Sequence, residues 1–443
     1  MHTVRCWITR FSAVRPHLRL SVRALVQSVC LPAPRIRLIC TLALLAGIAI
    51  LIHVKSRHRV VLLDFGPTNG TFQGYNPLRR LHAGQVMFRD FYPYLGIGPT
   101  VTSYLVLRLE GNDFRSSVHS QEILAAILHV GTLILLARLC RLSWFWSVAI
   151  AALLVFAGAK YCPTIEESYL PRTDHWAATI HGLFYMSQSA IALRAAAPIL
   201  LCVYAVVRHQ FGNTWEAKWS HCLADGCAAG LSLLWSNDYG LPTFAGFMTL
   251  FGLLAPGLTW SDRVKRSLRM AIVALITAGI VLTIATAGRP WAWFQYNAGV
   301  AADQFWYYEG RKVLRLSEIP RPAWVCLGLA SAGLLAVDLW RRPGALGARC
   351  LLFMLMVQLG AGYLSSIGGH IENHYFSAFQ RTLTFAAPYA VLRMFPAVNR
   401  TLPALRSAIA RVNASLGRNP RTVWVGAIVQ VSLAFWIGRE AKF

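Results

Sequence analysis

Blocks of mostly apolar residues recur along the whole chain, and they constrain its fold more than any other feature. Each block is roughly 17 to 22 residues long, about the length that crosses ~30 Å of hydrocarbon as an α-helix. Within a membrane, helices and closed barrels are the structures that satisfy their own backbone hydrogen bonds. A soluble enzyme with a buried core does not need so many separate apolar blocks. The sequence therefore predicts an all-α polytopic membrane protein.

This fold is expected to contain about 11 transmembrane helices with long outer loops. A basic cytoplasmic arm, residues 1–37, carries seven arginines and no acidic residue. One transmembrane domain follows at 38–438, with a first outer loop at about 55–117 and a short outer tail at 439–443. The predicted spans lie near 38–54, 118–137, 143–159, 189–207, 220–235, 240–257, 268–287, 322–340, 349–367, 380–395 and 422–438.

Charged residues are divided unequally between the two sides that these spans define. The formal net charge of +25 would suggest a nucleic-acid partner in a soluble protein. Here the basic residues recur between apolar blocks, which indicates membrane topology instead, and no nucleic-acid partner is expected. With the N-terminus in the cytoplasm, 24 of the 43 Lys and Arg residues lie inside and 14 of the 18 Asp and Glu residues lie outside. Insertion into a membrane does not require carboxylates on one side, so this asymmetry is the first indication of function.

The first outer loop has the composition of a polar site at the membrane surface. Asp64 follows the first span, and Asp90 stands in the stretch FRDFYPY. A carboxylate at this depth can act as a general base toward a hydroxyl group. Arg79, Arg80 and Arg89 can hold a phosphate through charge-assisted hydrogen bonds. The alternative is that Arg89 and Asp90 form an ordinary surface ion pair.

Other candidate residues lie in later segments. Arg194 is predicted inside a span, where a charged residue usually faces a cavity or a partner. Asp238 lies in a short turn between two predicted spans, where it can also serve as a simple N-cap. Glu372 and His374 belong to an H-x-E-x-H pattern, which lacks the one-faced spacing of a helical zinc site. The second outer loop is a further candidate for a divalent metal, with solvation as the alternative; its residues are Glu166, Glu167, Arg172, Asp174 and His175.

The order of residues in the first outer loop resembles that of GT-C type integral-membrane glycosyltransferases, especially their bacterial members. The similarity lies in a first span, an Asp, a polar stretch, and then G-x-x-x-x-R-D-F-Y…G-x-G-P ahead of the second span. The matching residues are Gly84, Arg89, Asp90, Phe91, Gly98 and Pro99. GLSLLWSNDYGLPTFAGFMTLFGLL resembles the family's glycine-rich helix, outer turn and returning helix, and ENHYFSAFQRTLTFAAPYAVL resembles a late segment of the family.

This resemblance implies a sugar donor linked to a polyprenyl phosphate. It also implies a catalytic carboxylate in the first loop, at Asp90 or Asp64. Many relatives carry an acidic pair soon after the first span, whereas Phe65 follows Asp64 here, so Asp90 is favoured. Substrate contacts are expected from Arg79, Arg80, Arg89, Tyr92, Tyr94, Arg194, Asp238, Glu372 and His374.

The expected function is transfer of a sugar to a lipid, glycan or protein acceptor on the outer face, in a membrane taken to be a bacterial inner membrane. Its expected partners are the lipid-linked sugar, membrane lipid and the acceptor. A divalent metal ion stays open as a cofactor, although the chain contains no D-x-D motif. The alternatives are a transporter or flippase for an amphipathic solute, although no internal repeat supports one, and a non-catalytic protein that binds a lipid-linked saccharide.

Overall fold

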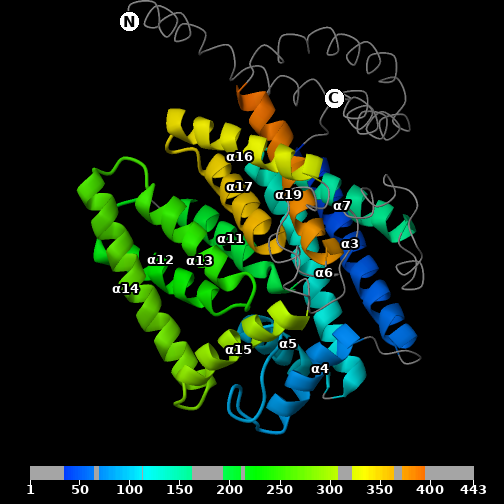
Figure 1. Ribbon diagram of the computed structural model, residues 1–443. Coiled ribbons are helices and arrows are strands. Elements are labelled where there is room, and N and C mark those ends of the chain that lie inside the picture. Colours follow the sequence, from blue (N-terminus) through cyan, green and yellow to red (C-terminus); the bar gives the residue numbers. More distant parts are fainter. Residues whose placement is uncertain are drawn as a thin grey trace, which may run out of the picture. The chain divides into compact units, whose positions relative to one another are not determined.

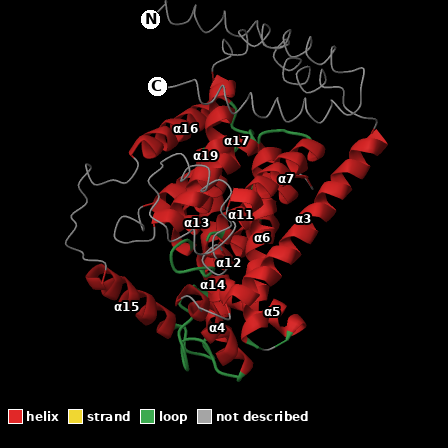
Figure 2. Cartoon of the chain, turned by 90° about the vertical axis from the view of Figure 1, so that its right-hand side faces the viewer, coloured by secondary structure: helices red, strands yellow, loops and turns green. Residues whose placement is uncertain are grey.

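A computed structural model describes residues 34–63, 69–111, 113–161, 193–210, 215–307, 322–363 and 372–394. The chain divides into two compact units, Met1–Ile39 with Val391–Phe443, and Cys40–Ala390. Nearly all the described residues belong to the second unit. They form helices joined by short loops, without a strand in this part of the chain (Figures 1 and 2).

The described helices follow one another in a single chain order. They are α3 (Pro34–Leu63), α4 (Asn69–His82), α5 (Ile97–Glu110), α6 (Phe114–Leu139), α7 (Trp144–Tyr161), α11 (Ala196–Gln210), α12 (Trp219–Leu233), α13 (Gly240–Phe247), the π-helix η1 (Met248–Leu253), α14 (Trp260–Ala285), α15 (Trp291–Tyr307), α16 (Pro322–Arg341), α17 (Leu346–Val357), the π-helix η3 (Gln358–Tyr363) and α19 (Glu372–Met394).

Three helices are long and apolar enough to cross a membrane, judged by length and composition. They are Phe114–Leu139, Trp260–Ala285 and Ala323–Arg341. Five apolar helices are shorter, namely Arg37–His53, Trp144–Val155, Ala196–Gln210, Gly240–Leu253 and Leu346–Ala361. The prediction of a helical chain with membrane-spanning segments is confirmed to this extent. The number of about eleven spans stays a prediction, and the last of them, 422–438, lies outside the described residues.

Much of the predicted first outer loop is helical. α3 continues to Leu63, and the helices α4 and α5 follow within the loop. α4 is polar and ends with Arg79, Arg80 and His82 in its last turn, where positive charge compensates the negative end of the helix dipole. α15 likewise occupies the predicted loop at 288–321. The sequence prediction missed these helices because they did not fit the pattern of an apolar span.

The close packing of α12 against α14 depends on two glycines of α12. A Cβ on Gly226 would lie 2.6 Å from Val273 Cβ, and one on Gly230 would lie 2.4 Å from Ala274 O. Small residues allow membrane helices to approach in this way. Arg266 and Leu282 lie in the early and late turns of α14 respectively, about 24 Å apart at 1.5 Å per residue.

Two buried arginines satisfy backbone carbonyls where η1 ends. Arg349 Nη1 donates to Leu254 O at 2.9 Å and also to Leu250 O. Arg266 Nε donates to Phe251 O at 3.1 Å. The last carbonyls of a helix lack partners within the helix, and both arginine side chains are buried. These guanidinium groups therefore stabilise the fold by donating hydrogen bonds to the carbonyls at the end of η1.

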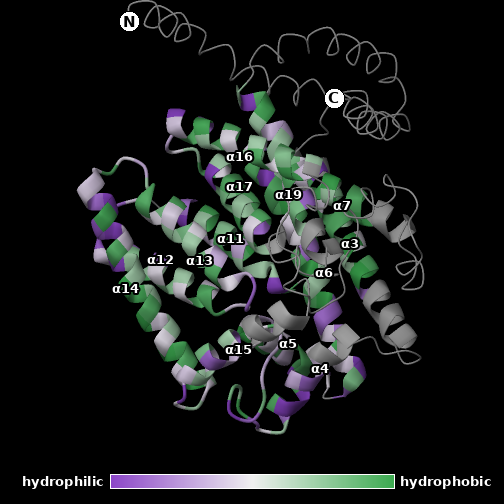
Figure 3. Ribbon diagram, viewed as in Figure 1, coloured by the Kyte–Doolittle hydropathy of each residue, from purple (hydrophilic) through white to green (hydrophobic). Residues whose placement is uncertain are grey.

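Exposed tryptophans mark the ends of several apolar helices. Trp144, Trp219 and Trp260 begin α7, α12 and α14, and Trp340 lies near the end of α16. The start of α14 is hydrophilic and its later turns are mainly hydrophobic (Figure 3). Exposed tryptophan at helix ends is typical of a membrane–water interface.

Candidate functional site

The turn that contains Asp90 is closed by the side chain of Asp90 itself. Val86 N–H donates to Asp90 Oδ2 at 2.8 Å, and Asp90 N–H donates to Val86 O at 2.9 Å. Phe88 has a left-handed φ of 62°, a conformation that persists only where surrounding contacts hold it. The buried rings of Phe88 and Phe91 belong to a cluster with Leu282 of α14. This turn is therefore a fixed part of the fold.

Arg89 makes two parallel hydrogen bonds to the Asp90 carboxylate. Nε lies 3.0 Å from Oδ1 and Nη2 lies 2.8 Å from Oδ2. The bonds from Arg89 and the backbone N–H of Val86 lower the pKa of Asp90 to about 2, and the charge of Arg289 contributes. Asp90 is consequently ionised at neutral pH and is a weak base while Arg89 holds it. Its role as the catalytic base stays a prediction.

Arg80 connects α4 to the same turn. Its Nη1 donates to Asp90 O at 3.1 Å, and its Nε donates to Asn76 Oδ1 at 3.3 Å. Arg79 lies beside it in the last turn of α4 and is exposed. The structure thus brings Arg80, Arg89 and Asp90 together at one place.

The segment 94–98 contacts the turn between α12 and α13 directly. Asn237 Nδ2 donates to Tyr94 O at 3.0 Å, and Gly98 N–H donates to Trp235 O at 2.8 Å. Gly96 has a φ of 101°, and a Cβ there would lie 2.5 Å from Ser236 Cα. The stretch 84–99, where the family resemblance is most specific, is therefore in contact with the turn in WSNDYG, the second stretch compared with the family, although about 140 residues separate them.

Arg194 and Asp238 form an ion pair in which Arg194 Nη1 lies 2.5 Å from Asp238 Oδ2. Ser236 Oγ donates to Arg194 O at 3.2 Å, and Trp235 Nε1 donates to Leu193 O at 2.7 Å. Arg194 was predicted inside a span; it is helical and precedes the turn residue Ala195 and the start of α11 at Ala196. The carbonyls of Leu193 and Arg194 thus accept hydrogen bonds from the turn that carries Asp238.

A stacked pair of tyrosine rings lies next to these residues. The rings of Tyr92 and Tyr296 are 4.6 Å apart and nearly parallel, with 3° between their planes. Burial raises the pKa of Tyr296 to about 12, with smaller contributions in the same direction from Tyr94, Asp238 and Tyr92. These four residues are therefore electrostatic neighbours, and we call Tyr92, Tyr94, Tyr296 and Asp238 the tyrosine cluster. Sequence analysis missed Tyr296, whose signal was its place in the aromatic stretch WAWFQYN.

A further arginine lies near Tyr239, next to the tyrosine cluster. Arg381 Nη1 is 2.9 Å from His129 Nδ1; His129 is buried and Arg381 is partly buried. Burial raises the pKa of Tyr239, while the charges of Arg194 and Arg381 act in the opposite direction. Polar groups therefore continue from Asp238 into the helical core. His129 could not be singled out from the sequence, because a lone His in an apolar helix has no distinctive spacing.

Several predicted residues lie outside the described part of the chain. They are Asp64 and the second-loop residues 166–175, and the side chains of Glu372 and His374 in the first turn of α19 are not described either. Among the residues that the structure does describe, no three His, Cys, Asp or Glu side chains gather as they would around a metal ion.

No family model matches this chain, and no curated protein or solved structure matches it. The arrangement itself combines three chemical capacities. Guanidinium groups can hold an anionic group, a partly exposed carboxylate can accept a hydrogen bond or a proton, and an aromatic pair offers a flat apolar surface.

Proposed function

We propose that this chain is a membrane glycosyltransferase that moves a sugar from a polyprenyl phosphate to an acceptor on the outer face of a bacterial inner membrane. One observation carries the proposal. The two stretches that resemble GT-C enzymes, remote in sequence, meet through the hydrogen bonds of Asn237 and Trp235 to the segment 94–98. Their meeting gathers arginines, carboxylates and tyrosines at one place, as an enzyme of this class requires. The N-terminus is cytoplasmic in this proposal.

The arginines bind the donor phosphate. Arg89 is partly exposed and lies beside Arg80, with Arg79 on the same turn of α4. The phosphate leaves as an anion when the glycosidic bond breaks, so fixed positive charge stabilises the transition state more than the ground state. Arg194, buried and paired with Asp238, orients the turn at the back of this site.

The base is a carboxylate of the first loop, Asp90 or Asp64. Arg89 holds Asp90 at low basicity before the donor binds. When a donor phosphate takes over the Arg89 guanidinium, the pKa of Asp90 rises toward its ordinary value and Asp90 can accept the proton of the acceptor hydroxyl. Binding of the donor therefore prepares the base.

The tyrosine cluster provides the surface for the sugar. Tyr92 is exposed, and its ring is stacked against Tyr296. The C–H face of a sugar ring is apolar and packs on an aromatic face, while the tyrosine hydroxyls offer hydrogen bonds. Glu372 and His374 are further substrate contacts in this proposal.

The test is an analysis of lipid-linked sugars and surface glycans in a deletion strain. The strain is complemented with wild type, Asp90→Asn, Asp64→Asn or Asp113→Asn. Asp113 is the matched control, because its side chain accepts from Ser116 N–H at 2.7 Å as the N-cap of α6, and Asn preserves such a cap. All variants are first compared for abundance in the membrane.

We expect one glycan to disappear in the deletion strain and its polyprenyl-phosphate donor to accumulate. Wild type and Asp113→Asn restore the glycan, and the variant that lacks the base does not. Full rescue by Asp90→Asn assigns the base to Asp64. Rescue by both loop variants, or loss of an exported solute with no change in any glycan, contradicts the enzyme and favours a transporter.

A further inference from the structure

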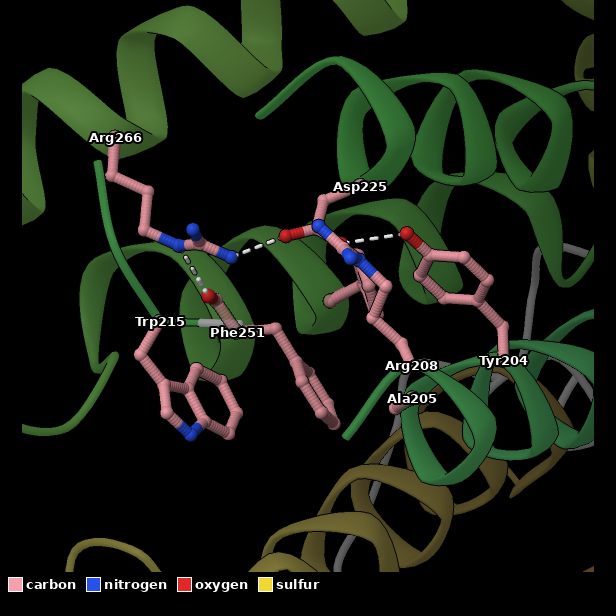
Figure 4. Close-up of a pocket in the computed structure, with 8 residues that line it drawn as sticks. Tyr204, Ala205, Arg208, Trp215, Asp225, Phe251 and Arg266 are labelled. Carbon is pink, nitrogen blue, oxygen red and sulfur yellow. Dashed lines mark hydrogen bonds and ion pairs between the residues drawn. The ribbon is translucent and has the colours of Figure 1, made fainter. Parts of the chain in front are cut away.

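A polar pocket lies beside the early turns of α14, about 24 Å along that helix from Leu282, which clusters with Phe88 and Phe91. The space enclosed among its side chains is about 10 Å³, so a ligand contacts the pocket from its open side, and Figure 4 shows the residues that line it. Arg208 and Tyr204 come from α11, Asp225 from α12 and Arg266 from α14, and the aromatic side is formed by Trp215, Phe247 and Phe251. We call this site the Asp225 pocket.

Asp225 and Arg266 satisfy each other and the surrounding backbone. Arg266 Nη2 donates to Asp225 Oδ2, and Arg266 Nη1 donates to Glu216 O at 2.7 Å. Tyr204 Oη donates to Asp225 Oδ1 at 2.7 Å. The single carboxylate that lines the pocket is thus fully engaged.

Arg208 brings a second positive charge to this one carboxylate. Its Nε is 3.8 Å from Asp225 Oδ1, beyond hydrogen-bond distance. That Nε atom is buried and has no hydrogen-bond partner, while the side chain as a whole remains 24% exposed. With two arginines and one aspartate, the pocket carries a net charge of +1. Such a pocket has the chemistry to bind an anion through a guanidinium group.

The exposed side of α11 beside Arg208 is apolar. Leu200, Val203 and Val207 are all exposed and recur at the spacing of one helix face. Trp219 is also exposed, and the Cζ atom of the Arg269 guanidinium lies over its ring, 5.1 Å from the ring centre. An anionic group above an apolar stripe matches a phospholipid, whose phosphate sits at the interface and whose chains lie along the helix. Inorganic phosphate has the same headgroup chemistry but nothing to cover the stripe.

We propose that the Asp225 pocket binds the phosphate of an anionic phospholipid in the cytoplasmic leaflet. Arg208 donates to the phosphate oxygens, Trp215 covers the headgroup, and the acyl chains follow Leu200, Val203 and Val207. This site rests on the membrane placement proposed above but not on sugar transfer, because it lies at the far end of α12 and α14 from the tyrosine cluster.

The test is native mass spectrometry of the full delipidated chain in detergent. The chain is titrated with dihexanoyl phosphatidylglycerol, with dihexanoyl phosphatidylcholine or with inorganic phosphate. Arg208→Gln removes the proposed donor, and Lys265→Gln is the matched control, since Lys265 is an exposed cation near the start of α14 that does not line the pocket. No sugar donor is present, so a failure here is distinct from a failure of the glycosyltransferase proposal.

We expect one retained phosphatidylglycerol per chain, with affinity reduced about tenfold or more in Arg208→Gln and unchanged in Lys265→Gln. Arg208→Lys keeps the charge without the two-pronged geometry, so its affinity falls between wild type and Arg208→Gln. It also provides the comparison if Arg208→Gln does not accumulate. Equal retention of phosphatidylcholine, equal binding of inorganic phosphate, or equal loss in Lys265→Gln and the Arg208 variants would overturn the proposal.

Discussion

The two ends of the α12–α14 pair use arginine in different ways. At the beginning of α14, Arg266 is 1% exposed and donates to two backbone carbonyls and to Asp225. Beside the end of α14, the side chain of Arg89 is 41% exposed and donates to a carboxylate that is itself 28% exposed. The first guanidinium is enclosed by the protein, and the second can reach a ligand.

This difference separates arginines that hold the fold from arginines that are available for chemistry. Removing a buried guanidinium leaves carbonyls and a carboxylate without partners in a region that water does not reach. Removing a surface guanidinium lets water take its place. Arg208 lies between these extremes, because it belongs to the enclosed end yet has a buried nitrogen without a hydrogen-bond partner.

The largest expected effect comes from Arg266→Gln. Loss of one partner of the buried Arg266–Asp225 pair should lower the free energy of unfolding by about 3–5 kcal/mol. The measurement is thermal unfolding of the purified chain in detergent, with Arg89→Gln as the comparison. Arg89→Gln should leave the unfolding midpoint almost unchanged while it abolishes sugar transfer. Equal destabilisation by the two variants would remove the distinction between the two ends.

Sequence analysis predicted the long apolar helices well, because membrane insertion depends on local composition. The predicted span 118–137 falls within α6, and the predicted span 268–287 overlaps α14 as far as its end at Ala285. Helices within the loops were missed because they are not apolar spans. The pairing of Arg194 with Asp238 was also missed, since the two residues are 44 positions apart and no local pattern joins them.

The same limit applies to the candidate site. Arg89 and Asp90 are adjacent in sequence, so their pairing was foreseen as one reading of the turn. The stacking of Tyr296 on Tyr92 depends on where α15 lies, and that is a property of the folded chain. The tyrosine cluster as a whole could therefore be recognised only after the remote segments were seen together.

A smaller effect is expected from Gly96→Ala, which tests how firmly the two resembling stretches are joined. The φ of 101° and the 2.5 Å approach to Ser236 Cα should together cost about 2–4 kcal/mol. Gly84→Ala is the control, because Gly84 also has a positive φ, 74°, but a Cβ there meets nothing within 4 Å. It should cost only the backbone strain, about 1–2 kcal/mol.

Unfolding in detergent and sugar transfer are measured for both glycine variants. Only Gly96→Ala should reduce transfer at a temperature where both proteins are folded, because it separates Tyr94 from Asn237. If the two variants behave alike, the contact between the stretches does not position the site.

The smallest expected effect is a shift in pH dependence, and it concerns Asp90. Because the pKa of Asp90 is depressed to about 2, its carboxylate contributes stability above its unfolded pKa and loses that contribution as pH falls through about 2.

The pH dependence of kcat/KM reports the pKa values of the free enzyme, and that of kcat reports those of the complex with substrate. If the donor phosphate draws Arg89 away, the acid limb of kcat should lie at higher pH than that of kcat/KM. In Arg89→Lys, which loses the paired hydrogen bonds, the acid limb of kcat/KM should move up toward the ordinary value of 3.8. Acid limbs that coincide in wild type, or an unchanged profile in Arg89→Lys, would mean that Arg89 does not control the basicity of Asp90. The exposed Arg89–Asp90 pair would then be a structural contact, like the buried Arg266–Asp225 pair at the other end.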